Sequence, residues 1–423
     1  MLARELSACF YHIWSRFFSV NAPVSLTMGS LFSTATSSYY PLQCHAAAVV
    51  GKEAFVFGGF RQHSSNNPSL IKFGSMSEST FVNLETKQKS NLPNVCGISP
   101  PSVHTAAFAA VGDHIYLFGG LALMFQDKGS RLNKLYGFHC PLREWSEKIP
   151  RGETPTERSE SAMCAVDGRL FLFGGYSGSG KWRDDLITLQ VEPELGEWTR
   201  PDCAGHRPSR RSGHTLTALP GNRIALFGGL NQAGSLNDLH VLSICDMIWE
   251  QVNLTECLPP KVYRHTANVL HAGPDFTFLL ILGGKQGQNF RDGKVVPCCF
   301  IVDICTGISA KVSGFAFSRA GHTTSCLKSD DGSTTIYVHG GGTGISDPHL
   351  FFKWNPKHCL SLVKESAKES ADMSELLRSG DYREKILSKR VEQEQKKARS
   401  MQQQQQNDKR VLVHQTHPTT TPE

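Results

Sequence analysis

The sequence contains no run of 18 apolar residues, so it predicts no transmembrane helix. It also lacks a Cys-x-x-Cys pair, and its 13 cysteines are scattered and odd in number. Such a set favours a reducing compartment over a disulfide framework. The excess of positive charge is small, a net +6 over 423 residues, and does not argue for nucleic-acid binding, which needs basic residues gathered on one face. No Ser/His/Asp or Cys/His grouping indicates nucleophilic catalysis.

What the sequence does have is a pair of glycines that ends an apolar run six times. The runs are EAFVFGG, HIYLFGG, RLFLFGG, RIALFGG, FLLILGG and TIYVHGG. The pairs are Gly58-Gly59, Gly119-Gly120, Gly174-Gly175, Gly228-Gly229, Gly283-Gly284 and Gly340-Gly341. Successive pairs are separated by 54 to 61 residues. A nearly constant period of this size marks an array of one supersecondary unit.

Each unit has the same order of strand-like segments. It opens on a histidine or a small residue, continues through a short run such as TLTALP and a turn, and then enters the apolar run that ends in Gly-Gly. A variable loop and a third run such as NDLHVLSI follow, and three units add a run that contains Trp145, Trp198 or Trp249. Short runs rich in β-branched and aromatic residues between turn residues predict strands, four in each unit.

The glycines and tryptophans have physical roles in such a unit. Glycine lets neighbouring backbones approach closely and adopts positive φ, and tryptophan supplies a large apolar area for packing. In these motifs the chain resembles the kelch-repeat family. The resemblance covers residues 42–364 and implies an all-β fold, a six-bladed kelch β-propeller. Residues 1–41 and 365–423 are then extensions on either side of it.

The two extensions carry signals of their own. Residues 1–41 are expected to be disordered. Arg4 and Arg16 loosely resemble a mitochondrial targeting segment, and Met28-Gly29 opens a myristoylation pattern that acts only if translation begins at Met28. Residues 365–423 mix Lys, Arg and Glu before a Gln-rich stretch, which predicts a charged helix that could contact a partner, followed by a disordered tail. We expect a cytoplasmic or nuclear protein, with mitochondrial targeting and myristoylation as alternatives.

Two patterns imitate cofactor or metal chemistry. The segment from Gly175 to Lys181 nearly matches a phosphate-binding loop, but Trp182 stands where Mg²⁺ binding needs Ser or Thr, and no helix follows. Histidines open five units, but equivalent positions of a propeller are spread around a ring, so we predict structural hydrogen bonds and no metal site. These histidines are His45, His104, His214, His265 and His322. We therefore expect no cofactor.

An arginine precedes the first strand in four units, and these arginines form the candidate binding site. The predicted rim consists of Arg158, Arg211, Arg264 and Arg319, with Ser102 in the corresponding place of the second unit. On one rim of a channel, guanidinium groups bind carboxylates or phosphates through paired hydrogen bonds. In the alternative, each arginine pairs with an acid of the propeller, such as Asp184 or Asp238. The sequence leaves both interpretations open.

The resemblance implies binding more than catalysis. Kelch adaptors use Arg and Ser before the first strand to read acidic or C-terminal peptide motifs. This favours a scaffold or adaptor that binds a partner protein or peptide on one face of the propeller. The alternative is an enzyme of sialic-acid or sugar-type chemistry in the propeller mouth, because some kelch propellers are enzymes. We find no BTB or F-box segment before the repeats, which weakens a role in a ubiquitin ligase.

Overall fold

The computed structural model describes residues 42–63, 72–75, 79–91, 95–123, 129–271, 277–312, 317–342 and 349–355. Every regular element in these ranges is a β-strand. The described residues therefore contain no helix that could span a membrane. The predicted N-terminal extension, and the predicted charged helix and Gln-rich tail, lie outside the described residues. The expectations for them stay predictions.

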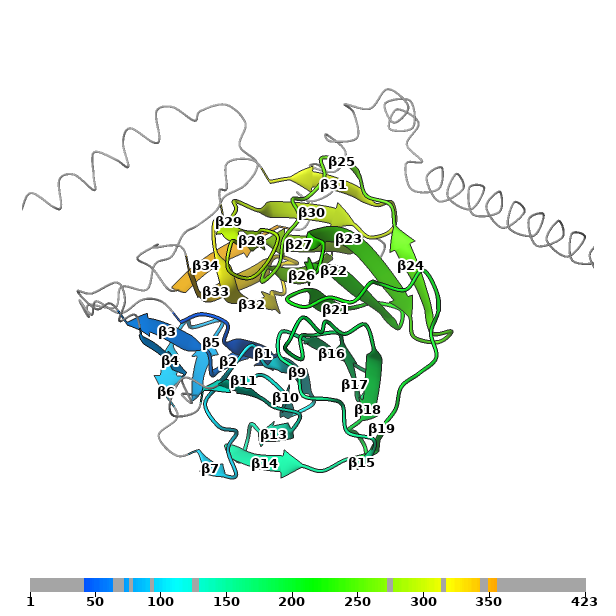
Figure 1. The fold of residues 1–423 in the computed structure, drawn as a ribbon. Coiled ribbons are helices and arrows are strands. Elements are labelled where there is room, and N and C mark those ends of the chain that lie inside the picture. The colour runs from blue at the N-terminus through cyan, green and yellow to red at the C-terminus, as the bar shows by residue number, and fades with distance from the viewer. Residues whose placement is uncertain are drawn as a thin grey trace, which may run out of the picture. The chain divides into compact units, whose positions relative to one another are not determined.

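Six sheets surround a central axis, and each contains one of the diglycine runs; they are called units 1 to 6 in chain order (Figure 1). From the inside outward, the first three units contain β1 (Ala46–Val50), β2 (Glu53–Phe57), β5 (Ser79–Asn83) and β6 (Lys89–Asn91); β9 (Ala107–Val111), β10 (His114–Phe118), β13 (Leu135–His139) and β14 (Glu144–Lys148); and β16 (Ala162–Val166), β17 (Arg169–Phe173), β18 (Leu186–Gln190) and β19 (Glu197–Trp198).

Units 4 to 6 follow the same order from the inside outward, but unit 6 has three strands within the described residues where the sequence predicted four. They contain β21 (Thr215–Leu219), β22 (Arg223–Asn231), β23 (Gly234–Ser243) and β24 (Ile248–Val252); β26 (Thr266–His271), β27 (Thr277–Leu282), β30 (Cys299–Asp303) and β31 (Ile308–Lys311); and β32 (Ala320–Lys328), β33 (Thr334–Gly342) and β34 (His349–Trp354). The innermost strands contact one another in the closed series β1, β9, β16, β21, β26, β32 and back to β1. The predicted kelch β-propeller is therefore confirmed as the fold.

Short parallel strand pairs connect neighbouring units at their outer edges. A two-residue strand in the segment between two units pairs in parallel with the outer strand of the next unit. The four pairs are β7 (Cys96–Gly97) with β14, β15 (Arg151–Gly152) with β19, β20 (Ala204–Gly205) with β24, and β25 (Thr255–Glu256) with β31.

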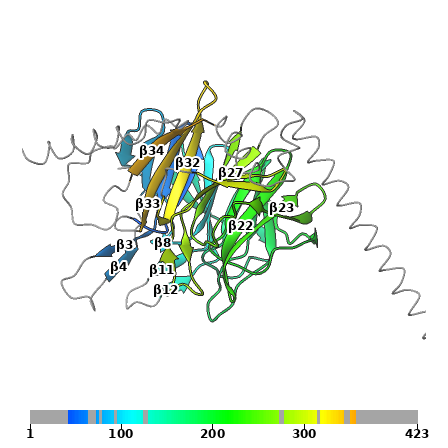
Figure 2. The ribbon, with the colours of Figure 1, turned by 90° about the horizontal axis from the view of Figure 1, so that it is seen from above.

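Short hairpins follow the diglycines and project at one end of the propeller, called the loop face. They comprise β3 (Phe60–His63) with β4 (Lys72–Ser75), β11 (Leu121–Leu123) with β12 (Gly129–Arg131), and β28 (Lys285–Gln286) with β29 (Lys294–Val295). β11 also pairs with β8 (Val103–His104). Figure 2 shows β3, β4, β8, β11 and β12 together beyond the ends of the sheets.

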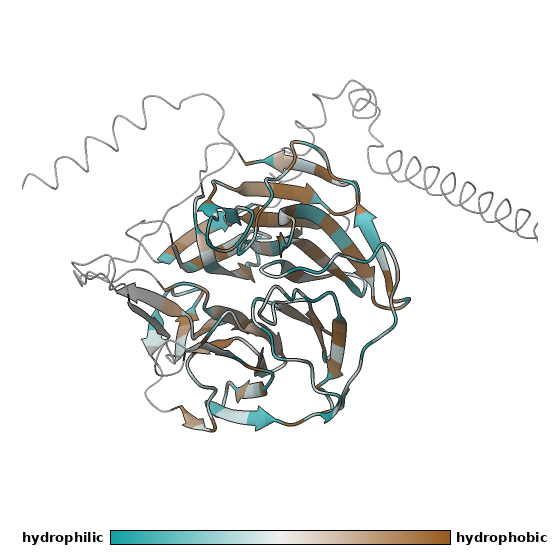
Figure 3. Ribbon diagram, in the orientation of Figure 1, coloured by the Kyte–Doolittle hydropathy of each residue, from teal (hydrophilic) through white to brown (hydrophobic). Residues whose placement is uncertain are grey.

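The hydrophobic core lies between adjacent units. One cluster joins Phe171 and Phe173 of unit 3 to Ile224, Leu226 and Trp249 of unit 4, and the other clusters join neighbouring units in the same way. Figure 3 shows the apolar residues concentrated along the strands of the sheets. Trp249 is 1% exposed, so the predicted packing role of this tryptophan is confirmed.

The diglycine of unit 4 is in close contact with two segments, the one that leads into β21 and the one that leads into β26. A Cβ atom on Gly228 would lie 2.8 Å from the carbonyl oxygen of Val262, and one on Gly229 would lie 2.9 Å from Cβ of His214. Gly229 also has a φ of +108°, a conformation that L side chains rarely adopt. Close approach and positive φ, the two reasons the sequence suggested, both apply at this position.

Candidate binding site at the channel mouth

The six segments that lead into the innermost strands share one backbone arrangement. In each, a carbonyl oxygen accepts a hydrogen bond from the second glycine of the preceding unit, at N···O distances between 2.6 and 2.9 Å. The accepting residues are Leu42, Val103, Arg158, Arg211, Val262 and Arg319. Arg158, Arg211 and Arg319 therefore occupy one repeat position. Arg264 and Ser102 do not, because Val262 and Val103 occupy it in their units.

The three arginines of this position do not form an exposed rim. Arg158 and Arg211 are 0% exposed, and Arg319 is 2% exposed. Arg158 donates to both carboxylate oxygens of Asp185 at 2.8 and 2.9 Å, and Arg211 donates to both oxygens of Asp238 at 2.7 and 2.8 Å. The prediction of a channel rim made from these side chains is corrected, because burial between the strands removes them from solvent. The alternative interpretation, in which each arginine pairs with an acid of the propeller, is confirmed for Arg211 with Asp238.

Asp185, not the neighbouring Asp184, is the partner of Arg158. Burial alone would raise the pKa of Asp185, but the hydrogen bonds and positive charge of Arg158 outweigh it and hold the pKa below its usual value. Burial would also raise the pKa of Asp238, but hydrogen bonds from His240 and Arg211 outweigh burial and lower it. Each arginine thus joins two units, since its backbone bonds to the preceding unit and its guanidinium to its own.

Two residues after this position, the backbone closes a ring around the axis. Six hydrogen bonds of 2.7–2.9 Å connect one residue of each unit to the next, without a break. The ring residues are Cys44, Thr105, Glu160, Gly213, Arg264 and Gly321. All six have φ between 52° and 65°, in the left-handed region, although only two are glycines.

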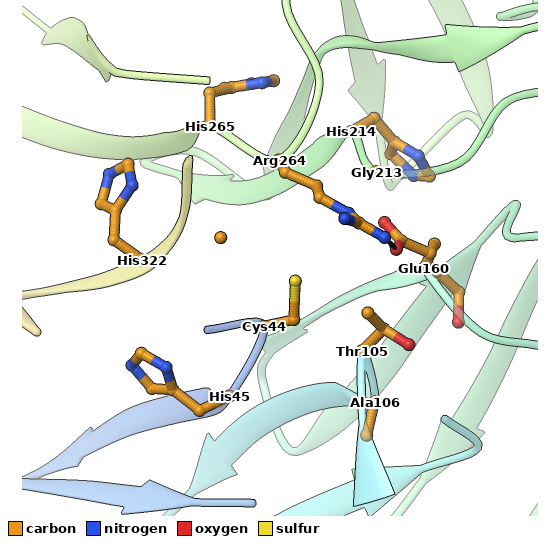
Figure 4. A pocket seen from close by; sticks show the side chains of 12 residues that line it. Cys44, His45, Thr105, Ala106, Glu160, Gly213, His214, Arg264, His265 and His322 are labelled. Atoms are coloured by element: carbon orange, nitrogen blue, oxygen red, sulfur yellow. Dashed lines mark hydrogen bonds and ion pairs between the residues drawn. The ribbon is translucent and has the colours of Figure 1, made fainter. Parts of the chain in front are cut away.

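The ring residues and their neighbours line a channel cavity of about 120 Å³. Figure 4 shows Arg264 directed across it towards Glu160, with the side chain of Cys44 below the guanidinium. Nε of Arg264 donates to Oε1 of Glu160 at 2.8 Å, and Nη2 bonds the same oxygen. Burial would lower the pKa of Arg264, but the interactions with Cys44 and Glu160 outweigh it and raise the pKa. Arg264 is thus the one predicted rim arginine that faces the channel.

The repeat histidines surround the cavity as neutral side chains. Nε2 of His45, His265 and His322 lies 2.7, 3.1 and 3.0 Å from a threonine hydroxyl of the preceding unit. Burial lowers the pKa of His45 and of His265 to about 3, and it lowers the pKa of His214 and His322 as well. The predicted hydrogen-bonding role is confirmed for these three histidines. Within the described residues, no group of three His, Cys, Asp or Glu could hold a metal ion.

His104 is not one of these repeat histidines. A Cβ atom on Gly120 would meet Ala106, just as one on Gly59 would meet His45, so Ala106 takes the histidine position in unit 2. His104 lies two residues earlier, in β8 at the loop face. The predicted equivalence of five histidines is therefore wrong for this one.

Aromatic and cationic side chains meet over the channel at the loop face. We call Arg131, Tyr176, Trp182 and Phe290 the mouth cluster. The ring of Tyr176 lies 5.3 Å from Trp182 and 5.8 Å from Phe290, and the guanidinium of Arg131 lies 4.9 Å from its centroid. Arg264 stacks on Phe290 at 5.4 Å, which joins the cluster to the channel cavity. Units 2, 3 and 5 thus contribute to one site.

The family model described as the KLHDC2/KLHL20/DRC7 Kelch-repeats domain matches residues 44–284, more than half of the chain. The chain belongs to this kelch-repeat family. Kelch domain-containing protein 10 of Rattus norvegicus is 24% identical over 274 residues, which cover 61% of this chain and 64% of that protein. Kelch domain-containing protein 2 of Bos taurus is 26% identical over 235 residues, covering 49% and 55%.

Other relatives carry the kelch-like region within much longer chains. The host cell factor homolog hcf-1 of Caenorhabditis elegans is 26% identical over 232 residues, which cover 51% of this chain but 28% of that protein. This chain therefore spans less than two thirds of the length of each of the three relatives. Kelch-repeat proteins are typically non-enzymatic scaffolds for protein interactions, and this propeller is a protein-interaction fold.

Sequence reasoning missed most of the ring residues and the whole mouth cluster. Counting back 13 residues from the first glycine of a pair reaches His45, Ala106 and Ser161, which gives the correct histidine position in units 1 to 3. That count would have moved the register away from His104 and revealed the ring residues Cys44, Thr105 and Glu160. The mouth cluster leaves no such signal, because it is assembled from loops of different length in three units.

Proposed function

We propose that this kelch propeller is a protein-binding scaffold whose loop face binds an acidic or C-terminal peptide segment of a partner over the channel mouth. The observation that carries the proposal is the mouth cluster. It places three half-buried aromatic rings beside Arg131 on a convergent set of loops. Aromatic residues and arginine are the residue types that carry most of the energy in protein interfaces.

The local charge favours an acidic ligand. Arg131, Arg264 and Lys285 stand near the channel mouth, and Glu160 compensates one of these positive charges. Nε of Arg131 donates to Ser159 at 3.3 Å, and the described residues place no carboxylate within ion-pairing distance of its guanidinium. A carboxylate or phosphate of a peptide could therefore bond Arg131 without displacing an existing partner.

A display library of peptides with free C-termini tests the proposal. We expect selection on the intact protein to enrich peptides that carry acidic residues or a specific C-terminal sequence. Arg131→Ala and Tyr176→Ala should each weaken a selected peptide by about tenfold or more, the usual effect of truncating an interface hot spot. Arg223→Ala removes an arginine at the turn between β21 and β22, away from the cluster, and should leave the affinity unchanged. Equal binding by all three variants would refute the proposal.

A further inference from the structure

Phe290 of the mouth cluster belongs to a loop that reaches from unit 5 to unit 3. The loop joins β28 to β29, and its residues 288–292 are called the flap. The ring of Phe290 lies 5.8 Å from that of Tyr176 in unit 3 and 5.8 Å from that of Tyr263 in unit 5. The guanidinium of Arg264 lies 5.4 Å from its centroid. Phe290 therefore covers a receiving surface formed by two aromatic rings and one guanidinium.

The hydrogen bonds of the flap are almost all internal. Oδ1 of Asn289 accepts hydrogen bonds from the backbone of Arg291 and Asp292, at 2.8 and 3.2 Å. The carboxylate of Asp292 accepts two from Asn289, at 2.9 and 3.2 Å. Within the described residues, one hydrogen bond connects the flap to the rest of the propeller, from the hydroxyl of Tyr263 to the carbonyl of Asn289 at 3.3 Å. The flap can therefore move as a unit at the loss of this long bond and the ring contacts of Phe290.

The receiving surface is held without the flap. The hydroxyl of Tyr176 accepts a hydrogen bond from the backbone of Gly180 at 3.0 Å, and the backbone of Tyr263 exchanges two with β28. Arg264 is fixed by its ion pair with Glu160. Aromatic rings in edge-to-face contact, and a guanidinium on a ring face, are arrangements that bind aromatic side chains. An aromatic ring of a partner therefore finds the same contacts that the ring of the flap makes.

The charge beside this surface favours an acidic partner. The guanidinium of Arg131 lies 4.9 Å from the centroid of Tyr176 and makes no ion pair among the described residues. Arg264 adds no free charge, because Glu160 neutralises it. The carboxylate of Asp292 makes its hydrogen bonds within the flap. The flap thus fills the aromatic part of the surface and leaves the charge of Arg131 to a ligand.

We propose that the flap is autoinhibitory: Phe290 occupies the place of an aromatic side chain of the partner, which displaces it when an acidic peptide binds. The inference rests on the proposed function and adds the chemistry of the peptide, an aromatic residue close to a carboxylate that bonds Arg131. A closed flap lowers the apparent affinity in proportion to the fraction of molecules in which it is open. Variants that open the flap should therefore bind aromatic acids more tightly than the wild type.

Gly293, the residue after the flap, supplies a variant that retains Phe290. A Cβ atom on Gly293 would lie 1.8 Å from the hydroxyl oxygen of Tyr263, so Gly293→Ala should displace the flap. Titration with 3-phenylpropionate, followed by nuclear magnetic resonance of the probe, measures the affinity of the surface. We expect Gly293→Ala and Phe290→Ala to bind this probe about fivefold or more tightly than the wild type. Arg291→Ala, which removes an exposed side chain of the flap, should bind it like the wild type.

Two further probes separate the contributions of the ring and of the charge. Propionate lacks the ring, so its affinity should not rise in either variant. The amide 3-phenylpropionamide lacks the charge. Adding Arg131→Ala to Phe290→Ala should therefore lower the affinity for the acid to that for the amide.

Equal affinity of the wild type and Gly293→Ala for 3-phenylpropionate would overturn the proposal. A gain confined to Phe290→Ala would overturn it too, because it would show a cavity and no displaceable flap. Circular dichroism shows whether each variant is folded. If Gly293→Ala is not, Tyr263→Phe takes its place, since it removes the hydroxyl that bonds the flap.

The probe titration needs no selected peptide, so it is read independently of the proposed function. Peptides from the display library should contain an aromatic residue near their acidic group and bind Phe290→Ala more tightly than the wild type. Selected peptides that lack an aromatic residue and bind Phe290→Ala more weakly would contradict this inference and leave the proposed function intact.

Discussion

Arg211 and Arg210 show how neighbouring residues of one type take different roles. Arg211 is fully buried and bonds Asp238, Ser209 and a backbone carbonyl, whereas the side chain of Arg210 is 65% exposed and lies 3.9 Å from Asp184. Breaking a buried pair leaves an uncompensated charge, and an exposed pair contributes little. The position in the repeat, not the residue type, decides the role.

Arg211→Ala should therefore lower the free energy of unfolding by about 3–5 kcal/mol. Asp238 would keep only the hydrogen bond with Nε2 of His240 among its side-chain partners in the described residues. Arg210→Ala is the matched control and should change the stability by less than about 0.5 kcal/mol. Urea denaturation of the two variants measures the difference. Equal stabilities would show that the buried arginine does not fasten the units.

Gly229 and Gly180 separate two effects of adding a side chain. Both have positive φ, but a Cβ atom on Gly229 meets His214 and Ser212, whereas one on Gly180 has no atom within 4 Å. Gly180→Val should cost only the backbone strain, about 1–3 kcal/mol. Gly229→Val should cost about 1–3 kcal/mol more, because it also overpacks the contact. Thermal unfolding of both variants tests this, and equal losses would mean that close approach is unimportant at the diglycine.

At the scale of strands, hydrogen bonds between histidine and threonine connect the innermost strands of adjacent units. The threonine follows the histidine of its own unit, as in His265-Thr266. Unit 3 has Ala162 at the threonine position. This explains why Nε2 of His214 in unit 4, unlike that of the other three histidines, bonds no threonine hydroxyl among the described residues. The bond is present wherever both residue types occur in consecutive units.

Ala162→Thr should supply the missing partner and raise the free energy of unfolding by about 1 kcal/mol, the typical net value of a hydrogen bond. Ala162→Val is the control, since it has the same branching without the hydroxyl. Chemical denaturation should find the threonine variant more stable than the valine variant. A valine variant of equal stability would attribute the gain to strand propensity alone.

The strands and the propeller could be predicted because their signals repeat. Six diglycines at a nearly constant period, with alternating apolar residues, are determined by packing between equivalent units, which is the same problem solved six times. The site could not be predicted in this way. Arg158 and Arg264 look alike in sequence, but one lies between strands and the other crosses the channel, because they differ by two positions in a register that insertions obscure. Phe290 meets Tyr176 only through the closure of the ring.

At the scale of the whole molecule, the propeller surrounds its channel with four buried, neutral histidines, His45, His214, His265 and His322. Their pKa values are lowered on folding because burial disfavours the charged imidazolium. In the unfolded chain a histidine has a pKa of about 6.5. As the pH falls below this value, these histidines bind protons in the unfolded chain but not in the folded propeller. The folded state therefore loses stability.

The free energy of unfolding should therefore decrease as the pH falls from about 6.5 to about 3. At the lower limit His45 and His265 become protonated in the folded state as well as in the unfolded state. Each such histidine contributes a slope of about 1.4 kcal/mol per pH unit in this window and none above it. His265→Gln removes one titrating group while keeping a side chain that can bond Thr215, so it should reduce the slope by about one proton. Urea denaturation at several pH values measures both slopes. Two parallel curves, or a stability that stays constant down to about pH 4.5, would mean that the ring histidines are protonated in the folded propeller.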